Sequence, residues 1–121
     1  MRANERRLAI LLAGTIIGMA ALPSAGDAAS FNCAKATLPD EIAVCANPDL
    51  NDADVEMATR YSMLLQLMAM GSAGAMRDGQ KAWLAWRKAC GSDVACLRNA
   101  YRVRIGAFKS AFQRVVARGP F

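Results

Sequence analysis

The 121-residue chain contains no histidine. Histidine is the side chain used most often as a general base, and it is the commonest protein ligand of transition metals. Its absence excludes catalytic pairs of serine or cysteine with histidine, and it removes the usual partner of cysteine in zinc sites. The sequence also lacks a glycine-rich phosphate loop, a G-x-S-x-G turn and an H-E-x-x-H pair. We therefore expect no catalytic residues, no metal ion and no cofactor, and a protein that is not an enzyme.

The apolar run over residues 8–22 is too short to span a membrane as a helix. It has about 15 residues, whereas a bilayer needs roughly 20. Three arginines precede the run, and Pro23 and small residues follow it, which is the pattern of a secretory signal peptide cleaved near Ala28. An uncleaved anchor is the alternative. We expect residues 1–28 to be removed and residues 29–121 to form one exported domain, periplasmic or secreted, without a membrane span.

Four cysteines are present, and none has the C-x-x-C spacing typical of zinc knuckles and redox centres. The spacings are C-x11-C for Cys33 and Cys45 and C-x5-C for Cys90 and Cys96. An exported domain meets an oxidising compartment, where small domains use disulfides to support a thin hydrophobic core. We expect two local disulfides, Cys33–Cys45 and Cys90–Cys96, while the crossed pairings remain open at this point.

Apolar residues recur at steps of three and four along the domain, which predicts an all-α fold, a small antiparallel helical bundle. The first helix should have Thr37 at its N-cap, with Asp40 completing a capping box. The second should begin with Asp49 or Asn51 as its cap and end at Gly71, and the small residues GSAGA should then form a link. We expect about four helices, over residues 38–46, about 50–70, 76–89 and 93–117.

The heptapeptide CGSDVAC constrains the chain between the last two helices. Six residues of unbroken helix would separate the Cα atoms of Cys90 and Cys96 by about 9 Å along the axis, and disulfides rarely tolerate more than about 7 Å. A bond between these cysteines therefore requires a break in the helix. Gly91 is a suitable helix stop and Ser92 or Asp93 a suitable N-cap, so the sequence supplies that break.

Several polar residues occupy or border the apolar stripes of the predicted helices. A buried isolated charge costs several kcal/mol, so an acid on one helix and arginines on two others indicate pairing. We expect Asp54 to pair with Arg87, Arg104 or both, in a buried polar network that fixes helix register. A ligand pocket lined by the same groups is the alternative. The set is Asp54, Tyr61, Gln80, Arg87, Tyr101 and Arg104.

The last predicted helix is basic. Residues 29–121 carry 12 Lys and Arg against 8 Asp and Glu, so the domain keeps a net charge of +4. A basic helical face binds anionic partners, and export argues against nucleic acid. A solvated face is one interpretation, and a surface for an envelope polyanion or an acidic protein is the other. The candidate partner-binding residues are Arg98, Arg102, Lys109 and Arg114.

Three segments of the domain carry an ordered pattern of residues. They are FNCAKATLPDEIAVCANPDLNDADVEMATRY, QKAWLAWRKACG and CLRNAYRVRI, and together they cover nearly the whole domain. The pattern resembles the LprI-like lysozyme inhibitor family. The positions that match are Phe31, Cys33, Lys35, Ala36, Glu41, Cys45, Leu50, Asp54, Tyr61, Gln80, Trp83, Leu84, Arg87, Cys90, Cys96, Leu97, Tyr101, Arg104 and Ile105.

The resemblance implies an exported protein that binds lysozyme or another muramidase and has no catalysis of its own. The net positive charge opposes long-range attraction to animal lysozymes, which are generally basic. An acidic patch around Asp49, Asp52, Asp54 and Glu56 offers a contact in spite of that charge. The competing hypothesis is a structural or adaptor domain of the cell envelope, which holds a partner through its basic last helix.

Overall fold

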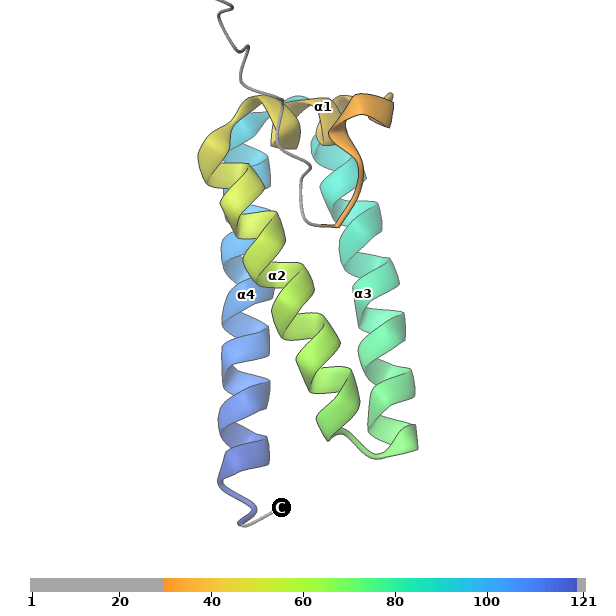
Figure 1. Ribbon diagram of the computed structural model, residues 1–121, viewed down its shortest axis with the longest axis vertical. Helices are drawn as coiled ribbons and strands as arrows, with labels where there is room; N and C mark the ends of the chain where they lie inside the picture. The colour runs from red at the N-terminus through yellow and green to blue at the C-terminus, as the bar shows by residue number, and fades with distance from the viewer. Residues whose placement is uncertain (1–29, 120–121) are drawn as a thin grey trace, which may run out of the picture.

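Three long helices run antiparallel, and a short helix lies across one end of them (Figure 1). The computed structural model describes residues 30–119, so the predicted signal peptide over residues 1–28 lies outside the described residues. A single 3-10 turn, Cys33–Lys35, precedes the helices. The helices are α1 (Pro39–Ala46), α2 (Pro48–Leu67), α3 (Met70–Cys90) and α4 (Val94–Val116). The predicted all-α fold of about four helices is confirmed.

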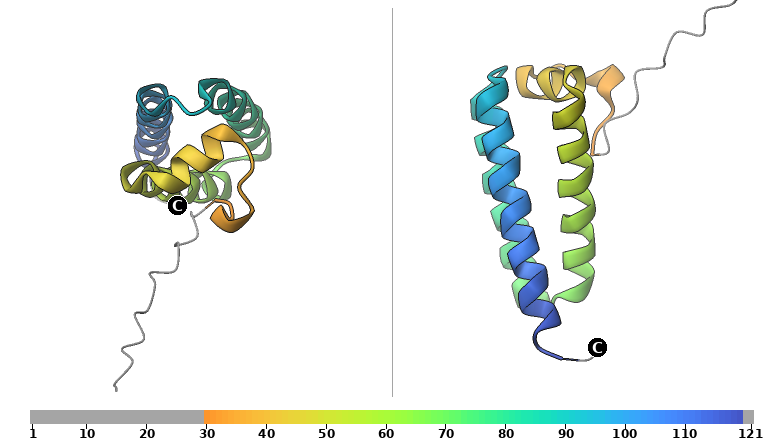
Figure 2. Two further views of the ribbon diagram at one scale, coloured as in Figure 1. Left: turned by 90° about the horizontal axis from the view of Figure 1, so that it is seen from above. Right: turned by 90° about the vertical axis from the view of Figure 1, so that its left-hand side faces the viewer.

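Helix α1 meets α2 at a sharp corner, which places α1 across the end of the bundle (Figure 2). Proline occupies the first position of both helices, where its missing N–H would have no intrahelical partner. Asn47 alone separates them, and its Nδ2 donates a hydrogen bond of 2.8 Å to the carbonyl of Ala43. Neither helix has a side-chain cap, so the expectations of Thr37 as the cap of α1 and of Asp49 or Asn51 as that of α2 are wrong.

The turn between α2 and α3 differs from the predicted link. Met68 and Ala69 have extended backbone and make the turn, and the small residues 71–75 lie inside α3. Ala73 is buried against the bundle, and its N–H donates to the carbonyl of Ala69 at 2.9 Å. Glycine lowers helix propensity by about 1 kcal/mol per residue, which tertiary packing overrides here. The prediction that Gly71 stops the second helix is therefore wrong.

The corner between α3 and α4 has the predicted form. Gly91 ends α3 with φ of 55°, a conformation that favours glycine. Asp93 caps α4, and its Oδ1 accepts a hydrogen bond of 3.0 Å from the N–H of Cys96. Cys90 and Cys96 are joined, with their Cα atoms 5.6 Å apart. Both predicted disulfides are thus present, because Cys33 and Cys45 are joined with a Cα separation of 5.7 Å.

The core lies mainly between α2 and α4, which pack along most of their lengths. Helix α3 packs on α4 through Trp83, whose Nε1 donates to the carbonyl of Ala100 at 3.0 Å. Contacts between α2 and α3 are few. Residues 30–32 lie between these two helices instead, as Figure 1 shows. Most of the larger core residues recur at helical spacing; they are Leu50, Met57, Leu64, Trp83, Leu97, Tyr101, Ile105 and Phe108.

Candidate functional site

A buried cluster of charged and polar side chains takes one residue from each helix. Asp40 comes from α1, Asp54 from α2, Arg87 from α3 and Tyr101 from α4. Each is at most 6% exposed. Removing one member of such a buried group leaves the others without a partner, at a cost of about 3–5 kcal/mol. The cluster therefore ties the four helices together in one register.

Arg87 is the centre of this cluster. Its Nε donates to Oδ2 of Asp40 at 2.9 Å, and its Nη1 lies 3.6 Å from Oδ1 of Asp54. The hydroxyl of Tyr101 donates to the same Asp54 oxygen at 2.8 Å and accepts from Arg87 Nη1 at 3.4 Å. Burial and the charge of Asp54 raise the pKa of Tyr101, so its hydroxyl keeps its proton and remains a donor. Burial by itself would lower the pKa of Arg87, but Tyr101 and Asp40 outweigh it and the pKa is raised.

The residues before the first cysteine complete the cluster. The N–H of Ser30 donates to Oδ2 of Asp54 at 3.2 Å, and its hydroxyl donates to the same oxygen. The ring of Phe31 lies against Arg87, with the guanidinium carbon 5.3 Å from the ring centroid. The segment thus closes the cluster on the side where α2 and α3 diverge. Sequence reasoning missed Ser30, because a serine upstream of the first helix carries no periodic signal.

Asp40 was also missed as a member of the cluster. Its position three residues after Thr37 indicated a capping box, and it stood on no apolar stripe. The structure places it at 1% exposure beside Arg87. Helix α1 crosses the end of the bundle. Its inward-facing residues therefore could not be identified from the apolar stripes of the other helices. Asp54 is therefore not the only acid on an inward face.

The remaining predicted residues form a second polar group farther along the bundle. Nε of Arg104 donates to Oε1 of Gln80 at 2.9 Å, and Nε2 of Gln80 donates to Sδ of Met57 at 3.1 Å. The Arg104 guanidinium lies over the ring of Phe108, 4.3 Å from its centroid, and Tyr61 stacks on the same ring at 6.0 Å. Burial lowers the pKa of Arg104. The sequence predicted that Asp54 pairs with Arg87, Arg104 or both. In the structure Arg87 contacts Asp54, and Arg104 contacts Gln80 instead.

The predicted basic residues of α4 do not form one face. Each residue of an α-helix advances about 100° around the helix axis. Arg98, Arg102 and Lys109 therefore lie within about 40° of one another around the axis of α4, and Arg114 lies on the opposite side of the helix. Two of them are paired with acids of α2: Arg98 with Asp49 at 2.6 Å, and Lys109 with Glu56 at 3.4 Å. The hydrogen bond from Arg98 holds the pKa of Asp49 below its usual value. Arg60 also pairs with Glu56, at 2.8 Å.

These pairs also change the expected acidic patch. Asp54 is buried, and the carboxylates of Asp49 and Glu56 contact basic side chains. Asp52 is exposed and, within residues 30–119, makes no ion pair. An acidic surface at the start of α2 therefore consists mainly of this one carboxylate.

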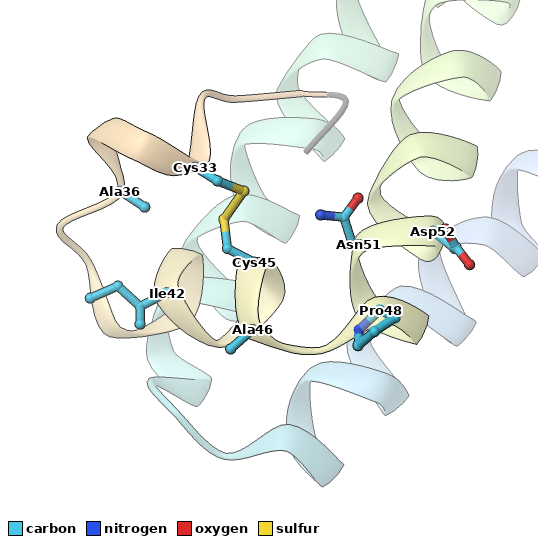
Figure 3. Close-up of a pocket in the computed structure, with 8 residues that line it drawn as sticks. All are labelled: Cys33, Ala36, Ile42, Cys45, Ala46, Pro48, Asn51 and Asp52. Carbon is cyan, nitrogen blue, oxygen red and sulfur yellow. A yellow bond between two sulfur atoms is a disulfide. The ribbon is translucent and has the colours of Figure 1, made fainter. Parts of the chain in front are cut away.

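A hollow of about 510 Å³ opens on the outer surface where α1 meets α2 (Figure 3). The Cys33–Cys45 disulfide lies in its wall, and Asp52 is the only charged residue of the set that lines it. A second hollow of about 470 Å³ lies between α2 and α3 beside Phe31. The first is lined by Cys33, Ala36, Ile42, Cys45, Ala46, Pro48, Asn51 and Asp52.

The described residues contain no cluster of metal-binding side chains. Among residues 30–119, no three His, Cys, Asp or Glu side chains come together in a way that would hold a metal ion. The buried carboxylates of the cluster are at most 1% exposed, so a substrate does not reach them. In the same part of the chain, no helix combines the length and the apolar character needed to cross a membrane.

Comparison with known proteins identifies the family. The family model described as "Lysozyme inhibitor LprI" matches residues 33–117. The chain belongs to the LprI lysozyme inhibitor family. The match spans all four helices and all four cysteines of the LprI domain, and it confirms the resemblance found in the sequence. No curated protein and no solved structure matches the chain.

Proposed function

We propose that this LprI-family domain is an exported inhibitor that binds a lysozyme or a related muramidase and has no catalytic activity of its own. The family match over residues 33–117 carries the proposal. Disulfides form and persist in oxidising compartments, and both bridges of the domain therefore favour the periplasm or the cell exterior.

The positions of the acids and the rigidity of the domain support inhibition by binding. Among the acids of residues 30–119, Asp40 and Asp54 are buried beside Arg87, and Asp49 and Glu56 pair with basic side chains. General acid–base catalysis needs such groups within reach of a substrate. Two disulfides and the four-helix cluster hold the surface in one conformation. A preorganised surface loses less conformational entropy on binding, which favours affinity for a folded partner.

A lysis assay tests the proposal. Purified residues 29–121 are added to a C-type lysozyme, a G-type lysozyme and an endogenous lytic enzyme, and the clearing of a cell-wall suspension is followed by turbidity. We expect the domain to slow at least one of these enzymes at micromolar concentration. Lysis that proceeds unchanged at tens of micromolar with all three would contradict the proposal. The reduced, carboxymethylated domain is the control for non-specific protein effects.

A second candidate function follows from the distribution of charge. In the half of the bundle remote from α1, residues 58–79 and 106–119 contain five Lys or Arg and one Asp. An adaptor that holds an anionic envelope component by this half would use Arg114 and its neighbours. Capture from envelope extract, repeated with the exposed residues Arg77, Arg114 and Arg118 of this half changed to Glu, separates the two functions. The adaptor loses its ligand in this variant, and the inhibitor keeps its effect on lysis.

A further inference from the structure

Apolar side chains are exposed on the outer side of α1. Leu38 is 36% exposed and Ile42 is 51% exposed, and Ala46 follows at the same spacing of four residues. Residues four apart lie on the same side of a helix. Ile42 and Ala46 line the same hollow as Pro48 and Asp52 at the start of α2. We call the surface formed by these five residues the α1 cap surface.

The hollow of about 510 Å³ is part of this surface. Figure 3 shows the Cys33–Cys45 disulfide in its wall, between Ile42 and Pro48, with Asn51 turned toward the disulfide and Asp52 turned away from it at the rim. The disulfide and the proline ring restrict the backbone on both sides of the hollow. Its lining is apolar apart from Asn51 and Asp52. Such a lining suits a side chain with an apolar stem and a cationic end, as in Arg and Lys.

Charge is distributed unevenly along the bundle. The half next to α1, residues 30–57 and 80–105, contains seven Lys or Arg and seven Asp or Glu. The whole net charge of +4 therefore lies in the remote half. Helix α4 has 23 residues and is about 35 Å long, whereas the Debye length at physiological salt is about 8 Å. The remote charges are consequently screened at the α1 cap surface.

We propose that the α1 cap surface is the contact for a basic muramidase, with the apolar stem of an Arg or Lys of the enzyme over the hollow and its cationic end at Asp52 on the rim. This inference rests on the proposed function. The charge distribution removes the objection that a domain of +4 repels a basic enzyme. The half of the bundle next to α1 has no net charge, and Asp52 is the one acid of the α1 cap surface and makes no ion pair within residues 30–119. The basic residues of the remote half lie about two or more Debye lengths from that surface.

Matched substitutions at the two ends of the bundle test this contact. Ile42→Lys and Asp52→Lys change the α1 cap surface. Met63→Lys is the control for the first, because Met63 and Ile42 are both 51% exposed. Asp78→Lys is the control for the second, because Asp78 is also an exposed acid on a helix and the change in net charge is the same. Binding to a basic C-type lysozyme is measured by calorimetry, and circular dichroism checks that each variant is folded.

We expect Ile42→Lys and Asp52→Lys to weaken binding by about tenfold or more, and the two controls to change it by less than about twofold. If the wild-type domain binds lysozyme and the cap and control variants weaken binding equally, the proposed contact at the α1 cap surface is wrong and the proposed function stands. Absence of binding by the wild-type domain to each lysozyme and lytic enzyme would overturn both. Loss of affinity only in Met63→Lys or Asp78→Lys would place the contact at the remote end.

Discussion

Arg87 and Asp40 form a buried ion pair between α3 and α1, with Nε and Oδ2 2.9 Å apart although the residues are 47 positions apart in the chain. Their side chains are 7% and 1% exposed. This pair holds the short helix onto the bundle, because α1 presents few large side chains to the core. The position of the α1 cap surface therefore depends on this ion pair, which lies on the buried side of the same helix.

Replacing the acid of this pair should destabilise the domain strongly. Asp40→Ala leaves the Arg87 guanidinium buried with one carboxylate fewer, and we expect a loss of about 3 kcal/mol in the free energy of unfolding. Urea unfolding followed by circular dichroism measures the change. Asp78→Ala, at an exposed acid of α3, is the control and should shift stability by a few tenths of a kcal/mol. A similar small shift for Asp40→Ala would refute the role of the pair.

Ser30 and Asp54 should be energetically coupled. Asp54→Ala should destabilise by about 3 kcal/mol or more, and Ser30→Ala by about 1–2 kcal/mol through loss of a hydrogen bond to a charged group. The double variant should lose less than the two single changes together, because the serine has no acceptor once Asp54 is gone. Asp52→Ala, two residues earlier on the exposed side of α2, is the control. Strict additivity in a double-mutant cycle would contradict the contact.

The stability of the domain should fall in alkaline solution. The folded state raises the pKa of Tyr101 above its ordinary value of 10.0, so the folded hydroxyl keeps its proton where the unfolded one releases it. The resulting stabilisation is complete below about pH 10 and is lost as pH rises above that value. Unfolding free energies measured from pH 8 to pH 12 check this. Tyr101→Phe should flatten the alkaline part of the profile, and a profile unchanged by that substitution would contradict the assignment.

Gly79→Ala should stabilise the domain slightly. A Cβ at this position of α3 would lie 3.5 Å from Nη1 of Arg104, which is ordinary van der Waals contact. Alanine in a helix interior is favoured over glycine by about 0.5–1 kcal/mol. Gly74→Ala is the matched control, since a Cβ there meets nothing within 4 Å. A loss of stability at residue 79 with a gain at residue 74 would show that Arg104 cannot move away from Gln80.

Helical periodicity was sufficient to predict the bundle. Cysteine spacing and the expected export favoured the two local disulfides but left the crossed pairings open. The α3–α4 corner also followed from local chemistry, because Gly91 and Asp93 have strong positional preferences. The α2–α3 turn was misplaced, because glycine and serine at residues 71–75 favour a link intrinsically and only the packing of Ala73 makes them helical.

The polar cluster could be predicted in part. Periodicity identifies which side chains face inward, but it does not give their level along the bundle. Arg104 faces inward on α4, yet it lies at the level of Gln80, and the seven residues between Gln80 and Arg87 correspond to about 10 Å of helix. Ser30 and Asp40 come from segments whose placement depends on the tertiary fold. Their roles could not be derived from spacing.

Both disulfides lie at the α1 end of the molecule, and the α2–α3 turn at the other end has no covalent link. We therefore expect local opening to begin at that turn, where Met70 is 92% exposed and α2 and α3 make few contacts. Amide hydrogen exchange should be fastest around residues 67–72 and slowest beside the two bridges. A protease cut in this turn would leave two fragments with one disulfide each and no covalent link between them, so the α2–α4 core and the buried polar cluster alone would hold them together.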